Sequence, residues 1–123
     1  FWKNADETHG LATHIKWVFG VPTMKDAVER FRDFSLEGVL QDMRCPYLIL
    51  HGGHDVLGMS QATKTYEYAR RHGVNVTLRF VTPEETGAEH CQHDNPTIGQ
   101  ELLGDWLADV FGIDQRALTR RDL

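Results

Sequence analysis

Residues 46–55 read Pro-Tyr-Leu-Ile-Leu-His-Gly-Gly-His-Asp, and this segment predicts a buried strand followed by a tight turn. The uninterrupted apolar run at 47–50 is typical of a strand that is covered on both faces of a parallel sheet. Gly52 and Gly53 allow the backbone to turn sharply where the strand ends. The pattern therefore places the carboxylate of Asp55 just past the end of the strand.

The residues that follow predict a helix and a second strand. Ser60 is expected to cap a helix that runs to His72 and stops at Gly73. Residues 74–81 alternate in polarity and are rich in β-branched side chains, as strands often are. A strand, a helix and a strand in this order predict two parallel strands joined by a right-handed crossover.

A polar loop is expected over residues 82–94, and a last helix after it. Asn95-Pro96 predicts the helix start, with proline in the first helical position, and Gly112 predicts its end. The apolar stripe of this helix consists of Ile98, Leu102, Leu103, Trp106, Leu107, Val110 and Phe111. Two parallel strands with flanking helices indicate the α/β class.

The part of the chain before Cys45 has a helical character instead. Apolar spacing predicts helices at 7–19 and 24–33, the second opened by the capping box Thr23-x-x-Asp26. Ser35 is expected to open one further short turn of helix. We interpret this part of the chain as a lid and connector rather than as part of a sheet.

Composition indicates an ordinary globular protein. Apolar residues make up 41% of the chain and charged residues 25%, so disorder is not expected. The formal net charge of −5 argues against nucleic acid as a partner, because binding to phosphates requires clustered Lys and Arg. No apolar run approaches the roughly 20 residues of a membrane helix. Two cysteines, Cys45 and Cys91, form no disulfide framework, which favours a cytoplasmic location.

Two strands are too few for a parallel sheet. Such a sheet usually has several strands with both faces covered, so this pair alone would leave a long unpaired edge. The chain begins at Phe1 rather than at Met. We therefore expect the remaining strands to lie in residues that precede Phe1.

Asp55 and His90 are the candidate catalytic residues. Each is expected on a loop that follows a strand, in the order acid and then base. An imidazole can take the proton of a serine hydroxyl, and a carboxylate on its other nitrogen fixes the tautomer and stabilises the imidazolium. Residues 1–123 contain no serine on a Gly-x-Ser-x-Gly turn. His93, three residues after His90, is the alternative base.

The polar residues allow three other interpretations. A metal could be held by a set that consists of His51, His54, Asp55, His90, His93 and Asp94, although their spacing matches no known metal motif. Ser60 in Gly-Met-Ser-Gln-Ala looks like a nucleophile, but it follows the Asp55 strand and stands at a helix start. Cys91 beside His90 could suggest a thiol nucleophile, but adjacent loop residues rarely face each other. We therefore expect no bound metal, and we expect the nucleophilic serine to lie outside residues 1–123.

The chain resembles the C-terminal third of an α/β-hydrolase in two motifs. They are His51-Gly-Gly-His-Asp55, at the end of the next-to-last strand, and Gly87-Ala-Glu-His-Cys-Gln92, on the loop of the catalytic histidine. Residues 34–40, 43–46 and 88–92 are most similar to one branch of that superfamily. This branch holds prolyl-oligopeptidase-like hydrolases, dihydroxypseudooxynicotine hydrolase and fungal hydrolases that shorten aromatic polyketides. The resemblance is close over 34–112 and loose over 1–33.

The resemblance implies an organisation and an activity. Residues 1–42 would be a helical lid remnant and connector, 43–112 the C-terminal part of the hydrolase core, and 113–123 a tail. Asp55 and His90 would be the acid and base of a Ser-His-Asp triad that acts on a small-molecule carbonyl substrate. The bond cleaved would be an ester, an amide or a carbon–carbon bond next to a ketone. The branch that this chain resembles favours the carbon–carbon bond.

The same resemblance implies no cofactor, and it names no substrate-binding residue. The chain would require the missing N-terminal part of the fold as its partner, and a homodimer is compatible with it. Two other functional classes stay open. One is a non-catalytic binding protein with the hydrolase fold, and the other is a metallohydrolase that uses the His/Asp set.

Overall fold

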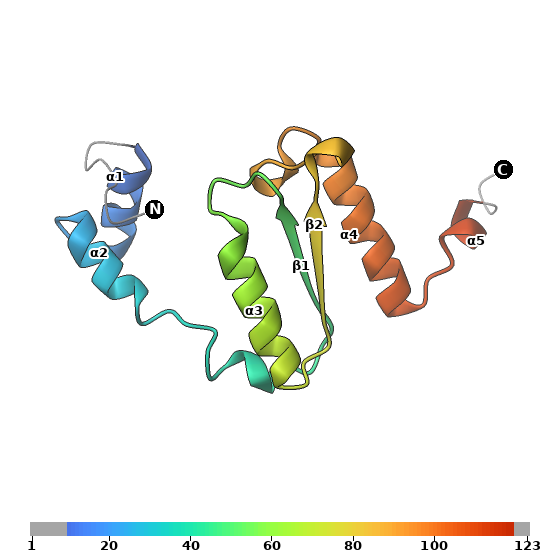
Figure 1. Cartoon of the computed structure of the whole chain (residues 1–123), viewed down its shortest axis with the longest axis horizontal. Coiled ribbons are helices and arrows are strands. Elements are labelled where there is room, and N and C mark those ends of the chain that lie inside the picture. Colours follow the sequence, from blue (N-terminus) through green and yellow to red (C-terminus); the bar gives the residue numbers. More distant parts are fainter. Residues whose placement is uncertain (1–9, 120–123) are drawn as a thin grey trace. The chain divides into compact units, whose positions relative to one another are not determined.

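The computed structural model describes residues 10–119 of the chain, and these residues form two compact units. The boundary between the units falls between Val39 and Leu40. The first unit is helical, whereas the second contains both strands and the longer helices (Figure 1). None of the helices in residues 10–119 combines the length and the apolar composition that crossing a membrane requires.

The first unit contains two helices, α1 (Gly10–Phe19) and α2 (Met24–Phe31). Its core consists of Ala12, Ile15, Met24 and Ala27, with Phe19 and Val21 packed against them. Thr23 is confirmed as the N-cap of α2, since its hydroxyl accepts a hydrogen bond from the backbone N–H of Asp26, and the hydroxyl also bonds to the Asp26 carboxylate at 2.6 Å. The predicted first three residues of the helix at 7–19 lie outside the described part of the chain.

The short helix predicted after Ser35 is wrong. The hydroxyl of Ser35 does accept a hydrogen bond from the backbone N–H of Glu37, but this contact closes a turn. Only a single 3-10 turn follows, at Leu40–Asp42. A local side-chain contact of this kind satisfies one backbone group and does not continue into a helix.

The second unit is built on two parallel strands, β1 (Tyr47–Gly52) and β2 (Val76–Val81). In the register of the pair, Tyr47 lies opposite Val76 and Gly52 lies opposite Val81. Helix α3 (Met59–Arg71) makes the crossover, α4 (Pro96–Phe111) follows the loop after β2, and α5 (Gln115–Thr119) lies in the predicted tail. Figure 1 shows α3 and α4 flanking the strand pair.

The two faces of the strand pair are covered unequally. On one face, α3 packs over a core of Leu40, Ala69, Val74 and Val76, which Tyr47 and Ile49 also contact. On the other face, Leu48 and Leu50 line an open groove of about 200 Å³ with Leu102 and Trp106 of α4. Residues 47–51 are therefore half-buried, and the prediction of a strand covered on both faces is wrong within the described residues. Only β2 pairs with β1 there, so the outer edge of β1 stays open.

The helix boundaries follow local chemistry, with one exception. Helix α4 begins at Pro96 and ends at Gly112, which adopts the left-handed conformation, so both predicted ends are confirmed. Helix α3, however, begins at Met59, and its N-cap is Gly58 rather than Ser60. Gly58 has a φ of 73° and donates its N–H to the carbonyl of Asp55, and this turn sets the helix start instead of a serine hydroxyl.

Candidate active site

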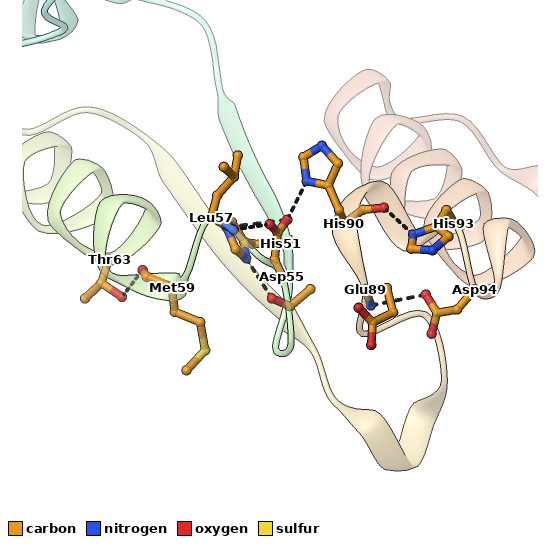
Figure 2. Close-up of polar contacts among 10 residues, drawn as sticks. His51, Asp55, Leu57, Met59, Thr63, Glu89, His90, His93 and Asp94 are labelled. Atoms are coloured by element: carbon orange, nitrogen blue, oxygen red, sulfur yellow. Dashed lines mark hydrogen bonds and ion pairs between the residues drawn. The ribbon is translucent and has the colours of Figure 1, made fainter. Parts of the chain in front are cut away.

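The two parallel strands bring their C-terminal ends to the same edge of the unit. Asp55 lies on the turn after β1, and His90 lies on the loop after β2. Nδ1–H of His90 donates a hydrogen bond of 2.9 Å to Oδ2 of Asp55 (Figure 2). The structure thus brings together the two residues that the sequence singled out, and their catalytic role stays a prediction.

The two partners differ in their exposure to solvent. The side chain of Asp55 is 6% exposed, whereas that of His90 is 50% exposed. Because Nδ1 of His90 points at the carboxylate, the other ring nitrogen, Nε2, is left for a further proton acceptor or donor. A shielded carboxylate behind an accessible imidazole is the arrangement that a general base needs.

Asp55 is held by its own turn. Its Oδ1 accepts the backbone N–H of Leu57 at 2.8 Å, while its Oδ2 accepts from His90. Burial raises the pKa of the Asp55 carboxyl, but the hydrogen bonds from Leu57 and His90 and the nearby imidazole charge outweigh it, so the pKa falls below its usual value. Asp55 is therefore an anion at neutral pH, and both of its oxygens can accept these hydrogen bonds.

A close backbone contact joins the two loops behind this pair. The backbone N–H of His54 donates to the carbonyl of Ala88 at 2.9 Å. At Gly52, a Cβ atom would lie 2.2 Å from that carbonyl oxygen and 2.5 Å from the carbonyl oxygen of Glu89. The sequence predicted that Gly52 serves a sharp turn, but its φ is not positive. Glycine is needed there because the loop of His90 approaches the strand so closely.

Replacing Gly52 with alanine is expected to destabilise the second unit by about 3 kcal/mol, because two backbone oxygens would have to move. Gly104→Ala in α4 is the matched control, since a Cβ there meets nothing within 4 Å. Alanine at that helical position should raise stability by roughly 0.5–1 kcal/mol. Urea unfolding of both variants checks this prediction, and equal midpoints would contradict it.

The loop of His90 has a strained backbone. Three of its non-glycine residues have positive φ angles: Thr86 (60°), Cys91 (54°) and Gln92 (53°). Each such residue costs about 1–3 kcal/mol and persists only where its surroundings enforce it. Gln92 is buried, and its side chain lies against Gly99 of α4, where a Cβ would approach it to 3.2 Å. The conformation of the loop is therefore imposed by its contacts.

Asp94 supplies the densest of these contacts. Its Oδ2 accepts the backbone N–H groups of Gly87 and Ala88, and its Oδ1 accepts that of Glu89. Burial raises the pKa of the Asp94 carboxyl, but the backbone N–H groups that it accepts lower it by more, and the net pKa falls. The group is thus an anion at neutral pH and can accept all three hydrogen bonds.

Two other histidines of this region, His51 and His93, contact backbone carbonyls. His51 places Nδ1 2.8 Å from the carbonyl of Gly52, and its Nε2 lies 3.9 Å from Oδ2 of Asp55. His93, the alternative base, places Nδ1 3.0 Å from the carbonyl of His90 (Figure 2). The imidazole that bonds to Asp55 is therefore that of His90.

The sequence also suggested a metal-ligand set and two alternative nucleophiles, Ser60 and Cys91. Residues 10–119 contain no group of three or more His, Cys, Asp or Glu side chains placed to hold a metal ion. Ser60 lies exposed in the first turn of α3, and Cys91 is an exposed free thiol.

Two contributions to the site were missed from sequence. The backbone N–H of Leu57 binds the acid, and no side-chain pattern reveals a backbone donor. The sequence indicates Asp94 only as a member of the possible metal-ligand set, whereas its carboxylate accepts hydrogen bonds from the loop that carries His90. No local sequence pattern indicates this role, because the N–H donors lie several residues before Asp94 in the loop.

Comparison with known proteins links the chain to a hydrolase. It is 28% identical over 97 residues to 2,6-dihydropseudooxynicotine hydrolase of Paenarthrobacter nicotinovorans, a match that covers 78% of this chain and 25% of that protein. The chain thus spans about a quarter of the length of this relative. No protein-family model matches the chain, and no solved structure does.

The fold and this similarity agree at a coarse level. Two parallel strands with flanking helices are compatible with an α/β fold. The relative is a hydrolase, and the similarity supports a suspected hydrolase-family link for this chain. A hydrolytic role is therefore the class of function that the comparison favours.

Proposed function

We propose that this chain supplies the acid and the base of a serine-type α/β-hydrolase. His90 would act as the general base and Asp55 as the carboxylate that orients it. The nucleophilic serine and the groups that stabilise the oxyanion would come from residues outside this chain. One observation supports the proposal above all others, which is the 2.9 Å hydrogen bond from Nδ1 of His90 to a carboxylate that is 6% exposed.

The chemistry follows from that hydrogen bond. With Nδ1 protonated and bound to Asp55, the neutral ring of His90 can accept a proton only at Nε2. When a serine hydroxyl attacks a carbonyl carbon, its proton passes to Nε2, and the anion of Asp55 stabilises the imidazolium that forms. The imidazolium then gives the proton to the leaving group, which completes one half of the reaction.

The substrate would be a small molecule with a polarised carbonyl group. Esters, amides and ketones with a cleavable neighbouring carbon–carbon bond all react through attack at this carbon and an oxyanion intermediate. Three apolar side chains close to Asp55 in sequence are exposed, namely Val56, Leu57 and Met59. They are compatible with an apolar or aromatic group on the substrate.

An active-site-directed fluorophosphonate tests the proposal on the complete polypeptide that carries residues 1–123. We expect the reagent to label one serine other than Ser60, and we expect His90→Ala to abolish labelling. His72→Ala is the matched control, because His72 stacks on Tyr68 and bonds to its carbonyl. We expect the reagent to label the His72→Ala variant as it labels the wild type. Absence of both labelling and hydrolysis of a panel of aryl esters, anilides and β-diketones would favour a non-catalytic binding protein.

A further inference from the structure

We infer that Asp94 is a positioning residue, which holds the loop after β2 in the conformation that presents His90 to Asp55. This inference rests on the proposed function for its catalytic meaning. It concerns a residue that touches neither the nucleophile nor the substrate. Its effect would pass through the backbone of residues 87–90.

The carboxylate of Asp94 binds three consecutive backbone N–H groups. Gly87 donates to Oδ2 at 2.8 Å, Ala88 to Oδ2 at 3.1 Å, and Glu89 to Oδ1 at 3.1 Å (Figure 2 draws the last of these). These residues immediately precede His90. An anion that accepts three successive N–H groups fixes the direction of each peptide plane between them, and hence the direction in which the next side chain leaves the backbone.

Ala88 connects this anchor to the turn of the acid. Its N–H points to Asp94, and its carbonyl oxygen accepts the backbone N–H of His54, which is the residue before Asp55. Ala88 is 3% exposed, so neither contact is readily replaced by water. One residue of the loop is thus held from both sides, by Asp94 and by the turn that carries Asp55.

The neighbouring contacts serve the loop rather than the helix. Asn95 is the N-cap of α4, yet its side chain makes no capping hydrogen bond to that helix. Instead, the amide of Asn95 donates to the hydroxyl of Thr86 at 2.7 Å. The polar side chains at this helix start therefore satisfy the loop, which includes the strained residues Thr86, Cys91 and Gln92.

The test compares Asp94→Asn and Asp94→Ala in the complete polypeptide. The amide side chain keeps one carbonyl oxygen, whereas alanine keeps no acceptor. We expect hydrogen exchange of the peptide that contains Gly87–Glu89 to accelerate in the order wild type, Asn and Ala. We also expect the Nδ1–H proton resonance of His90 to weaken in that order, and kcat for Asp94→Ala to fall about 100-fold with little change in KM, because a small displacement of the base suffices.

Asp109→Asn is the matched control, because Asp109 is an exposed carboxylate on α4 of the same unit, away from this loop. It should leave all three measurements unchanged. Wild-type exchange at Gly87–Glu89 and an intact His90 resonance in Asp94→Ala would overturn the inference, even if His90→Ala proves inactive. Conversely, if His90→Ala retains full activity, the proposed function fails, while a loss of the resonance in Asp94→Ala would still support the positioning of His90 by Asp94.

Discussion

His90→Ala in the complete polypeptide is expected to lower kcat by about four to six orders of magnitude, the range that loss of a catalytic base produces when the residues act as a unit. The imidazole of His90 is the one that bonds to Asp55, and under the proposed function its removal would leave no group to take the proton of the nucleophile. The side chain is half exposed and contributes little packing, so folding should persist. Steady-state kinetics and circular dichroism measure the two effects separately.

The matched control for this substitution is His93→Ala. His93 lies three residues further on, and its ring contacts the carbonyl of His90 instead of Asp55. We expect kcat of this variant to remain within about tenfold of wild type. If the activities of the two variants were reversed, the base would be His93, and the hydrogen bond between His90 and Asp55 would be structural only.

Asp55→Asn is expected to lower kcat by about four orders of magnitude. The amide can still accept the N–H of Leu57 through its carbonyl oxygen, but its NH₂ group would face Nδ1 of His90. That arrangement favours the tautomer with the proton on Nε2, which cannot act as a base. Measurement of kcat against pH checks this expectation, with Asp109→Asn as the control for loss of one carboxylate.

The charge of Asp55 also sets the direction of a stability change with pH. Because its pKa in the folded protein lies below the ordinary value of 3.8, ionisation of Asp55 stabilises the fold above that pH. This contribution is lost as the pH falls through the lowered pKa, and Asp55→Asn should lack it.

A kcat for Asp55→Asn within tenfold of wild type would contradict the proposed catalytic role of the Asp55 carboxylate.

The parts of the fold that could be predicted from sequence depend on local chemistry. Pro96 suits the first position of α4 because its ring fixes φ, and Gly112 ends the helix because glycine adopts the left-handed conformation without steric cost. The second strand was predicted from Val74, but it begins at Val76, since the N–H of Val74 bonds to the carbonyl of Ala69 and closes the end of α3. The ends of α4 thus follow from single residues, whereas the start of a strand depends on pairing with another segment.

The proximity of Asp55 and His90 was predictable for a different reason. In parallel strands the C-terminal ends share one edge, so residues that follow the two strands come together whatever the intervening sequence. The supporting contacts were not predictable. The need for glycine at position 52 arises from the approach of the Ala88 carbonyl, and the role of Asp94 arises from three backbone donors. Both depend on tertiary contacts that leave no periodic signal in the sequence.

The hydrogen bonds from Gly87, Ala88 and Glu89 to Asp94 close residues 87–94 into a ring of fixed length. Insertions and deletions inside this ring would separate the donors from their acceptor, whereas length changes before Thr86 would leave the ring intact. Exchange of this loop between homologous proteins should therefore succeed only when residues 87–94 are transplanted together, along with the glycine at position 52 that they contact.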